Sequence, residues 1–238
     1  MAVSIKSARE IELMREAGKR LAHVHQELEA MIAPGISTWE IDAKGEKLIR
    51  DCGCIPNFLH YNGYPASICV SVNDEVVHGI PRKDRYLKEG DIVSLDAGLI
   101  YKGYHSDAAR THAVGKVSTE AQKLMDVTKQ SFFEGIKMAK EGQHLHDISR
   151  AIEEYVAPYG YGIVRDLVGH GIGTALHEDP QIPNFPQKRR GVKLLPGMTL
   201  AIEPMINMGG WPVEFLDDGW TVVTRDGSLS AHYENTIL

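Results

Sequence analysis

The chain has 238 residues, 43% of them hydrophobic, which is enough for one large single-core domain or for two tightly joined halves. Its 26 lysines and arginines stand against 32 acidic residues, so the net charge is −6. No basic stripe dominates, which argues against an extended or sequence-specific nucleic-acid surface.

The N-terminus and the cysteines predict the compartment. The sequence has no apolar run of about 18 residues, so no membrane span is expected. No apolar stretch precedes Ser7, so no secretory signal is expected either. The three cysteines, Cys52, Cys54 and Cys69, do not form an even disulfide set, and free thiols are typical of a reducing cytoplasm. We therefore expect a cytoplasmic protein.

Two capping boxes predict the first two helices. Ser7 and Glu10 have the spacing that opens a helix, and an apolar stripe at helical spacing continues to about residue 32. The same motif recurs at Ser37 and Glu40 and opens a shorter helix toward Arg50. Alternating apolar residues then predict strands over residues 67–72 and 76–81.

Residues 90–107 predict a β-hairpin that carries two aspartates, Asp96 and Asp107. If Tyr101 and Lys102 form the loop, the two aspartates face each other directly. If Lys102 and Gly103 form it, they are diagonal neighbours on one face. A three-residue loop would place them on opposite faces unless a bulge intervened.

In two of these three registers, two carboxylates share one face at roughly 5–8 Å. Like-charge repulsion disfavours that arrangement, so we expect something cationic between them. In the plainer alternative, one acid is exposed and the other lies in a turn.

The rest of the chain repeats the plan of helices followed by strands. Helices are predicted over residues 119–140 and 145–157, and strands over 162–174, 199–208, 221–224 and 230–237. An offset of 107 aligns Gly35 with Gly142, Ile41 with Ile148, Gly53 with Gly160, Gly90 with Gly197, and Asp96 with Glu203. These matches predict one domain, residues 1–238, with duplicated halves of about 1–115 and 116–238. Facing halves would bring Asp96 and Glu203 together.

A histidine flanked by glycines, His170 in the run 169–173, is a further candidate. The run lacks the spacing of a dinucleotide-binding loop. Its glycines suit a close backbone approach to a ligand. His177 and Glu178 do not continue into a zinc-protease motif, because Gln181 stands where the second histidine would be.

These motifs together resemble type I methionine aminopeptidases, from about Ser4 to the end of the chain. The resemblance rests on His78-Gly79-Ile80-Pro81, the hairpin aspartates, Gly169-His170-Gly171-Ile172-Gly173, Ile202-Glu203-Pro204 and Tyr233-Glu234-Asn235-Thr236-Ile237. It implies an α+β pita-bread fold, in which two pseudo-symmetric halves of helices pack on an antiparallel sheet. It also implies removal of the initiator methionine from nascent proteins when the second residue is small, by metal-activated hydroxide attack on the first peptide bond.

The resemblance also implies a role for each site residue. It maps the family's two-metal ligands onto Asp96, Asp107, His170, Glu203 and Glu234. Glu203 is in addition the implied proton shuttle, while His78 and His177 are the implied substrate-contacting, catalytic histidines. The implied methionine pocket comprises Phe58, Tyr61, Tyr64, Cys69 and Trp220. Phe58 stands where many members have cysteine, and Leu176 stands where an aromatic residue is common.

The donor set itself points to the kind of cofactor. Four carboxylates and one imidazole suit two divalent ions of cobalt, manganese or iron better than zinc. The expected partners are peptides and nascent chains that begin with methionine. The basic clusters at 82–85 and 188–190 are expected to be solvated loops, with weak docking to an acidic partner such as the ribosome as the alternative, and a monomer is expected.

Three other classes of protein fit the sequence less well than a type I methionine aminopeptidase. Proline-specific relatives of the same fold usually carry an additional N-terminal domain, for which this chain is not expected to have room. A type II enzyme would need a long insertion between His170 and Glu234, which the sequence lacks. A binding module that had lost its metals should have lost a ligand, yet all five ligand residues are present.

Overall fold

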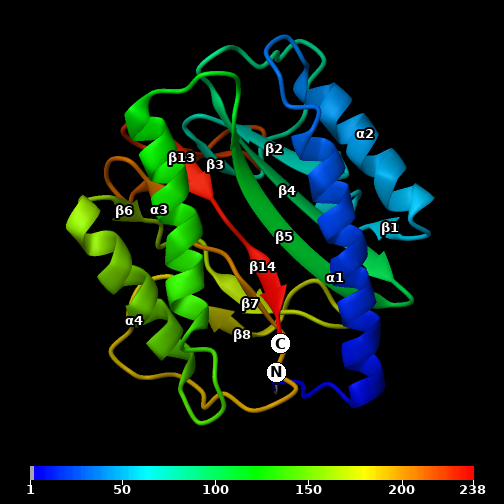
Figure 1. The fold of residues 1–238 in the computed structure, drawn as a ribbon, viewed down its shortest axis with the longest axis vertical. Helices are drawn as coiled ribbons and strands as arrows, with labels where there is room; N and C mark the ends of the chain where they lie inside the picture. Colours follow the sequence, from blue (N-terminus) through cyan, green and yellow to red (C-terminus); the bar gives the residue numbers. More distant parts are fainter. Residues whose placement is uncertain (1–2) are drawn as a thin grey trace.

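The structure, a computed structural model that describes residues 3–238, has the expected α+β architecture (Figure 1). In the view of Figure 1, α1 and α2 lie to the right, α3 and α4 lie to the left, and β4, β5 and β14 are seen between the two pairs. No described helix is long and apolar enough to cross a membrane. The helices are α1 (Ala8–Glu29), α2 (Thr38–Asp51), α3 (Thr119–Ile136) and α4 (Leu145–Val156), with 3₁₀ turns η1 (Tyr61–Gly63) and η2 (Ala157–Tyr159).

Both predicted capping boxes are confirmed. The Ser7 N–H donates to the Glu10 carboxylate at 2.7 Å, and the Ser37 N–H donates to the Glu40 carboxylate at 2.8 Å. The predicted helix ends were too late, since α1 ends at residue 29 and α3 at residue 136. Beyond α3 the chain switches to tighter three-residue bonds, such as Met138 N–H to Gly135 O at 3.0 Å, which close the last turn.

The strands are short, apart from one hairpin, and all pair in antiparallel fashion. One sheet places β5 and β2 on opposite sides of β4, with β1 beside the end of β4. The other sheets have the orders β14-β9-β7-β8, β13-β10-β6 and β11-β12-β3. The strands are β1 (Ile55–Pro56), β2 (Ile68–Val72), β3 (Glu75–Val77), β4 (Ile92–Tyr101), β5 (Tyr104–Ala113), β6 (Gly162–Ile163), β7 (Gly169–Gly171), β8 (Glu178–Ile182), β9 (Leu200–Ile202), β10 (Met205–Asn207), β11 (Val213–Phe215), β12 (Val222–Thr224), β13 (Ser230–His232) and β14 (Asn235–Ile237).

The β4–β5 hairpin has the second of the three possible registers. Its loop is Lys102-Gly103, and both residues have a left-handed backbone, with φ of 49° and 86°. Such a two-residue turn matches the natural twist of the strands. Gly98 pairs with Asp107, so Asp96 and Asp107 are diagonal neighbours on one face.

Two strands predicted as continuous are each broken in two. Residues 199–208 form β9 and β10, which lie in different sheets, and the break falls at Glu203-Pro204. Residues 230–237 form β13 and β14, also in different sheets, with the break at Tyr233-Glu234. Proline has no N–H to continue the ladder at the first break. At the second, the Glu234 N–H and carbonyl instead pair with Ala109 of β5, at 3.0 and 3.3 Å.

Backbone geometry repeats at the offset of 107 residues. A strand pairing between Ser37 and Tyr86 recurs between His144 and Lys193. Separate apolar cores lie beneath each helix pair, one around Leu21 and Leu95 and the other around Phe132, Ile148 and Ile206. The φ values match closely in three glycine pairs: 91° and 88° at Gly35 and Gly142, 70° and 72° at Gly53 and Gly160, and 92° and 89° at Gly90 and Gly197.

Candidate active site

One cavity of about 210 Å³ brings together every residue that the resemblance singled out. Acidic groups, histidines and aromatic side chains line it together. Its lining residues are Phe58, Tyr61, Asn62, Tyr64, Cys69, His78, Asp96, Asp107, His170, Leu176, His177, Glu203, Trp220 and Glu234. No lysine or arginine of residues 3–238 lines the cavity, so the expected cation between the aspartates is not a side chain of this part of the chain.

The first half supplies two acids from the β4–β5 hairpin. Asp107 is 5% exposed, and burial raises its pKa to about 7. Burial, followed by the charge of Asp107, raises the pKa of Asp96 well above its usual value. The Asp96 Oδ1 atom is buried and has no hydrogen-bond partner among the described residues. Both carboxylates are thus held where a negative charge lacks compensation.

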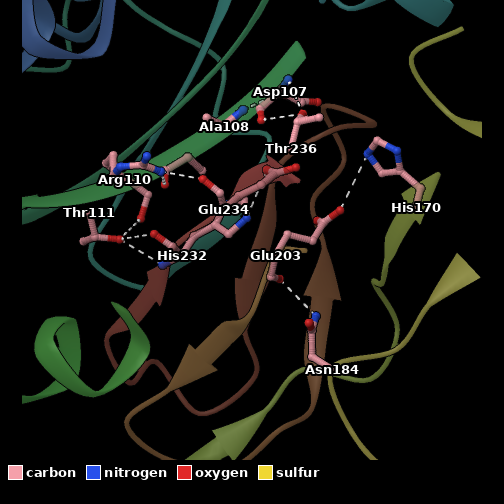
Figure 2. Close-up of polar contacts among 12 residues, drawn as sticks. Asp107, Ala108, Arg110, Thr111, His170, Asn184, Glu203, His232, Glu234 and Thr236 are labelled. Carbon is pink, nitrogen blue, oxygen red and sulfur yellow. Dashed lines mark hydrogen bonds and ion pairs between the residues drawn. The ribbon is translucent and has the colours of Figure 1, made fainter. Parts of the chain in front are cut away.

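The second half supplies two acids from the two strand breaks. Glu203 follows β9, and its carbonyl accepts a hydrogen bond from the side-chain amide of Asn184 at 3.0 Å (Figure 2). Glu234 is 2% exposed, and Arg110 donates to its backbone carbonyl rather than to its carboxylate. Burial, and next the Asp107 charge, raise the pKa of both glutamates well above their usual values. Four carboxylates therefore lie close together, and no lysine or arginine of residues 3–238 lines the cavity with them.

His170 presents one ring nitrogen to these acids. Its Nδ1 lies 2.8 Å from the carbonyl of Gly171, so Nδ1 carries the proton and Nε2 keeps its lone pair. Nε2 faces Glu203 Oε1 at 3.7 Å, as Figure 2 shows. Burial, and next the nearby His177, lower the pKa of His170 to about 4, so the ring is neutral at pH 7. A neutral imidazole that is oriented in this way can bind a metal ion through Nε2.

The glycines beside His170 have a different role from the predicted one. A Cβ at Gly169 would lie 2.4 Å from the carbonyl oxygen of Ala201, and one at Gly171 would lie 2.2 Å from that of Asp179. The close approach is therefore to neighbouring backbone in β9 and β8 rather than to a ligand.

A loop at the rim carries His177. Its Nδ1 lies 2.8 Å from the hydroxyl of Tyr61, and burial lowers its pKa. The adjacent Glu178 closes the loop, because its carboxylate accepts the N–H groups of Thr174 and Ala175 at 2.8 and 3.2 Å. The same carboxylate forms an ion pair with the buried Lys6 at 2.6 Å. The segment before α1 therefore fixes the loop that presents His177.

His78 faces the cavity from beyond the end of β3. The strand predicted over 76–81 stops at Val77, because His78 adopts a left-handed backbone with φ of 59°. Gly79 follows where a Cβ would lie 2.4 Å from the carbonyl oxygen of Val70. Burial lowers the pKa of His78 to about 4. A left-handed residue other than glycine is uncommon and is often found at a functional site.

The aromatic wall forms an apolar slot beside the acids. Tyr64 packs edge-on against Trp220 with ring centroids 5.1 Å apart, and its hydroxyl donates to the carbonyl of Gly79 at 2.9 Å. Cys69, with a pKa that burial raises, lies at the back of this wall, and all three cysteines are free thiols. Phe58 and Leu176, the two departures from the family pattern, both line the slot.

The donor atoms fit divalent metal ions. Two groups have ligand atoms within 4.8 Å of one another: Asp107 with His170 and Glu234, and Asp96 with His232 and Glu234. Sequence reasoning missed His232 and Asn62. A signal for His232 was available, since alternate residues of a strand face the same side and His232 stands two before Glu234.

Comparison with known proteins agrees with this geometry. The sequence matches the family described as metallopeptidase family M24 over residues 12–238. It is 53% identical to the methionine aminopeptidase of Clostridium acetobutylicum, covering 99% of this chain and 94% of that one. It is 51% identical to methionine aminopeptidase 1 of Bacillus subtilis, covering 98% and 93%.

Solved structures extend the likeness to the whole fold. The methionine aminopeptidase of Thermotoga maritima superposes with a TM-score of 0.97 at 46% identity, covering 100% of this chain and 95% of that one. The prolidase from Pyrococcus furiosus has a TM-score of 0.77 at 23% identity and covers 98% and 62%, so it shares the fold alone.

Proposed function

We propose that the chain, which belongs to metallopeptidase family M24 and functions as a methionine aminopeptidase, does so with five side chains that hold two divalent ions. The observation that carries this proposal is the convergence of Asp96, Asp107, His170, Glu203 and Glu234 in one cavity beside an apolar slot. The residues come from both proposed halves of the chain: Asp96 and Asp107 from the first, and His170, Glu203 and Glu234 from the second.

The substrate is the N-terminal methionine of a peptide or nascent protein. The aromatic edges of Tyr64 and Trp220, together with Cys69, suit a thioether side chain, because sulfur makes favourable contacts with aromatic rings. Cleavage is expected when the second residue is small, as the resemblance implies.

Two ions of manganese, iron or cobalt match the oxygen-rich donor set better than zinc. When bound, they supply Lewis acidity that lowers the pKa of water toward neutrality and offsets the clustered negative charge. Glu203, whose carboxyl has a raised pKa, is placed to take a proton from the attacking water and return it to the leaving amine.

His177 and His78 serve the peptide group itself. If the Tyr61 hydroxyl donates to His177 Nδ1, the proton of the neutral ring stands on Nε2, free to donate to the scissile carbonyl oxygen. That hydrogen bond strengthens as the oxygen gains charge. We propose that His78, which also lines the cavity, contacts the scissile nitrogen.

The wider setting is also a proposal. The three free thiols support a cytoplasmic location. We also propose that the protein is a monomer that acts on nascent chains. The basic clusters support only weak ribosome docking, because Arg82 pairs with Asp84 at 2.8 Å and Arg190 pairs with Asp147 at 2.5 Å. The matched glycine φ values support a duplication within a single domain of residues 1–238, with halves of about 1–115 and 116–238.

The test is a panel of Met-X peptides assayed with metal-loaded protein. We expect efficient cleavage when the second residue is alanine or glycine and rejection when it is leucine, with no activity after chelation. Equal rates for Met-Ala and Met-Leu peptides, or full activity without metal, would contradict the proposal.

A further inference from the structure

His232, the last residue of β13, is an unexplained buried imidazole. Its exposed fraction is 1%, and neither ring nitrogen has a hydrogen-bond partner among the described residues. Buried polar groups in native proteins almost always have a hydrogen-bond partner, because burial removes their hydrogen bonds to water and costs free energy unless a partner replaces them. A group this well buried and unpaired needs a partner that the side chains of residues 3–238 do not provide.

The fold points this ring at the acids. The ligand atoms of His232, Asp96 and Glu234 lie within 4.8 Å of one another. Thr111 fixes the backbone of His232, accepting its N–H at 2.8 Å and donating to its carbonyl at 2.9 Å (Figure 2). The placement of the ring is therefore built by the sheet rather than by a flexible loop.

The distances suit a shared ion rather than a hydrogen bond. His232 Nε2 lies 3.6 Å from Glu234 Oε2, beyond the usual range of about 2.7–3.2 Å for N–H···O bonds. Two ligands that each lie about 2.1 Å from one tetrahedral ion stand about 3.4 Å apart. Across the site, His170 Nε2 and Glu203 Oε1 are 3.7 Å apart, so both imidazole–carboxylate pairs have similar spacing.

We propose that His232 is a sixth metal ligand, binding one of the two ions together with Asp96 and Glu234. Each ion would then have an imidazole and an aspartate of its own, with Glu234 shared between them. A second nitrogen donor favours iron or cobalt over manganese. This inference rests on the proposed function, because it assumes that the acids hold metal.

The test uses metal-free protein titrated with Mn²⁺ alone, with pulsed electron paramagnetic resonance to detect bound nitrogen and calorimetry to measure affinity. The variants are His232→Gln, His170→Gln and, as a matched control, His25→Gln. His25 is also buried, but its Nε2 donates to the Ala108 carbonyl at 2.8 Å. We expect His232→Gln to lose part of the nitrogen coupling and to weaken one binding step at least about tenfold, while His25→Gln changes neither.

The outcomes separate this inference from the proposed function. If His170→Gln loses coupling but His232→Gln keeps the wild-type coupling and affinity, the sixth ligand is overturned and the metal site stands. If neither variant changes coupling, the metal site itself fails. If His232→Gln does not fold, the same resonance measurement is made on wild-type protein labelled with ¹⁵N-histidine. Two coupled histidine nitrogens are expected, and a single one would refute the inference.

Discussion

The two halves of the molecule contribute acids to one site in different ways. Asp96 and Asp107 lie on a single hairpin with strands of ten residues, whose two-residue turn fixes their relation. Glu203 and Glu234 lie at breaks between short strands that belong to different sheets. The first pair depends on local pairing, and the second depends on how distant segments meet. The comparison predicts that the site fails when either half loses an acid.

The largest effect is expected from a matched pair of substitutions, one in each half. Asp107→Asn and Glu203→Gln each keep the side-chain volume and remove a charge that a metal ion requires. Both should lower metal occupancy and reduce kcat/KM more than about a thousandfold. Metal analysis and steady-state kinetics on the same preparations measure this. If one variant keeps near-native turnover at low metal content, the acid from that half is not needed for the reaction and the prediction is wrong.

The next effect concerns His177, whose contact with substrate is made mainly in the transition state. His177→Ala should reduce kcat about 10²–10³-fold and leave KM within a few-fold, with both ions bound. Tyr61→Phe, which removes only the hydroxyl beside Nδ1, should cost less. If metal is lost together with activity, His177 is a ligand and the assigned role is wrong.

A smaller effect is expected where the first half holds a loop of the second. Glu178→Gln weakens the ion pair with Lys6 and loosens the loop that presents His177. We expect kcat to fall about tenfold with metal content unchanged. Lys6→Met should have a similar effect, and the double variant should lose little more than either single variant. Additive losses would show that the two residues act separately.

The smallest effect is on the stability of the metal-free protein. The folded-state pKa of Asp107 is about 7, above its unfolded value of 3.8, so the folded state holds the proton more tightly. The contribution of Asp107 to the free energy of unfolding is therefore fully present below about pH 4 and is lost as pH rises through 7. Melting temperatures should fall over this range without metal and not with it. If the melting temperature of the metal-free protein rises with pH over this range, the negative charges of the acids are already compensated within the protein.

The first half was largely readable from sequence. Capping boxes gave the starts of α1 and α2, and the hairpin reading left three registers, of which the Lys102-Gly103 turn selected one. In the structure, both residues of this turn have positive φ, which two-residue hairpin loops favour. The register of the hairpin is therefore set by the local geometry of its turn.

The second half was less readable, for a physical reason. No local pattern shows that residues 230–237 divide between two sheets, because the division follows from the pairing of Glu234 with Ala109, far away in sequence. Glu234 was therefore found only through the resemblance, whereas the offset of 107 residues had already aligned Glu203 with Asp96. His232 could have been predicted from its place two residues before Glu234 in the expected strand, but it lies outside the motifs that carry the resemblance.

The most direct test of a shared metal site is a titration of metal-free protein with Mn²⁺, Co²⁺ or Fe²⁺, following bound ions and cleavage of a Met-Ala peptide together. Without metal, the account predicts no cleavage. On titration, activity should return as ions bind, up to two per chain. Full activity with no bound ion, or two ions bound equally well after Glu234→Gln, would contradict it.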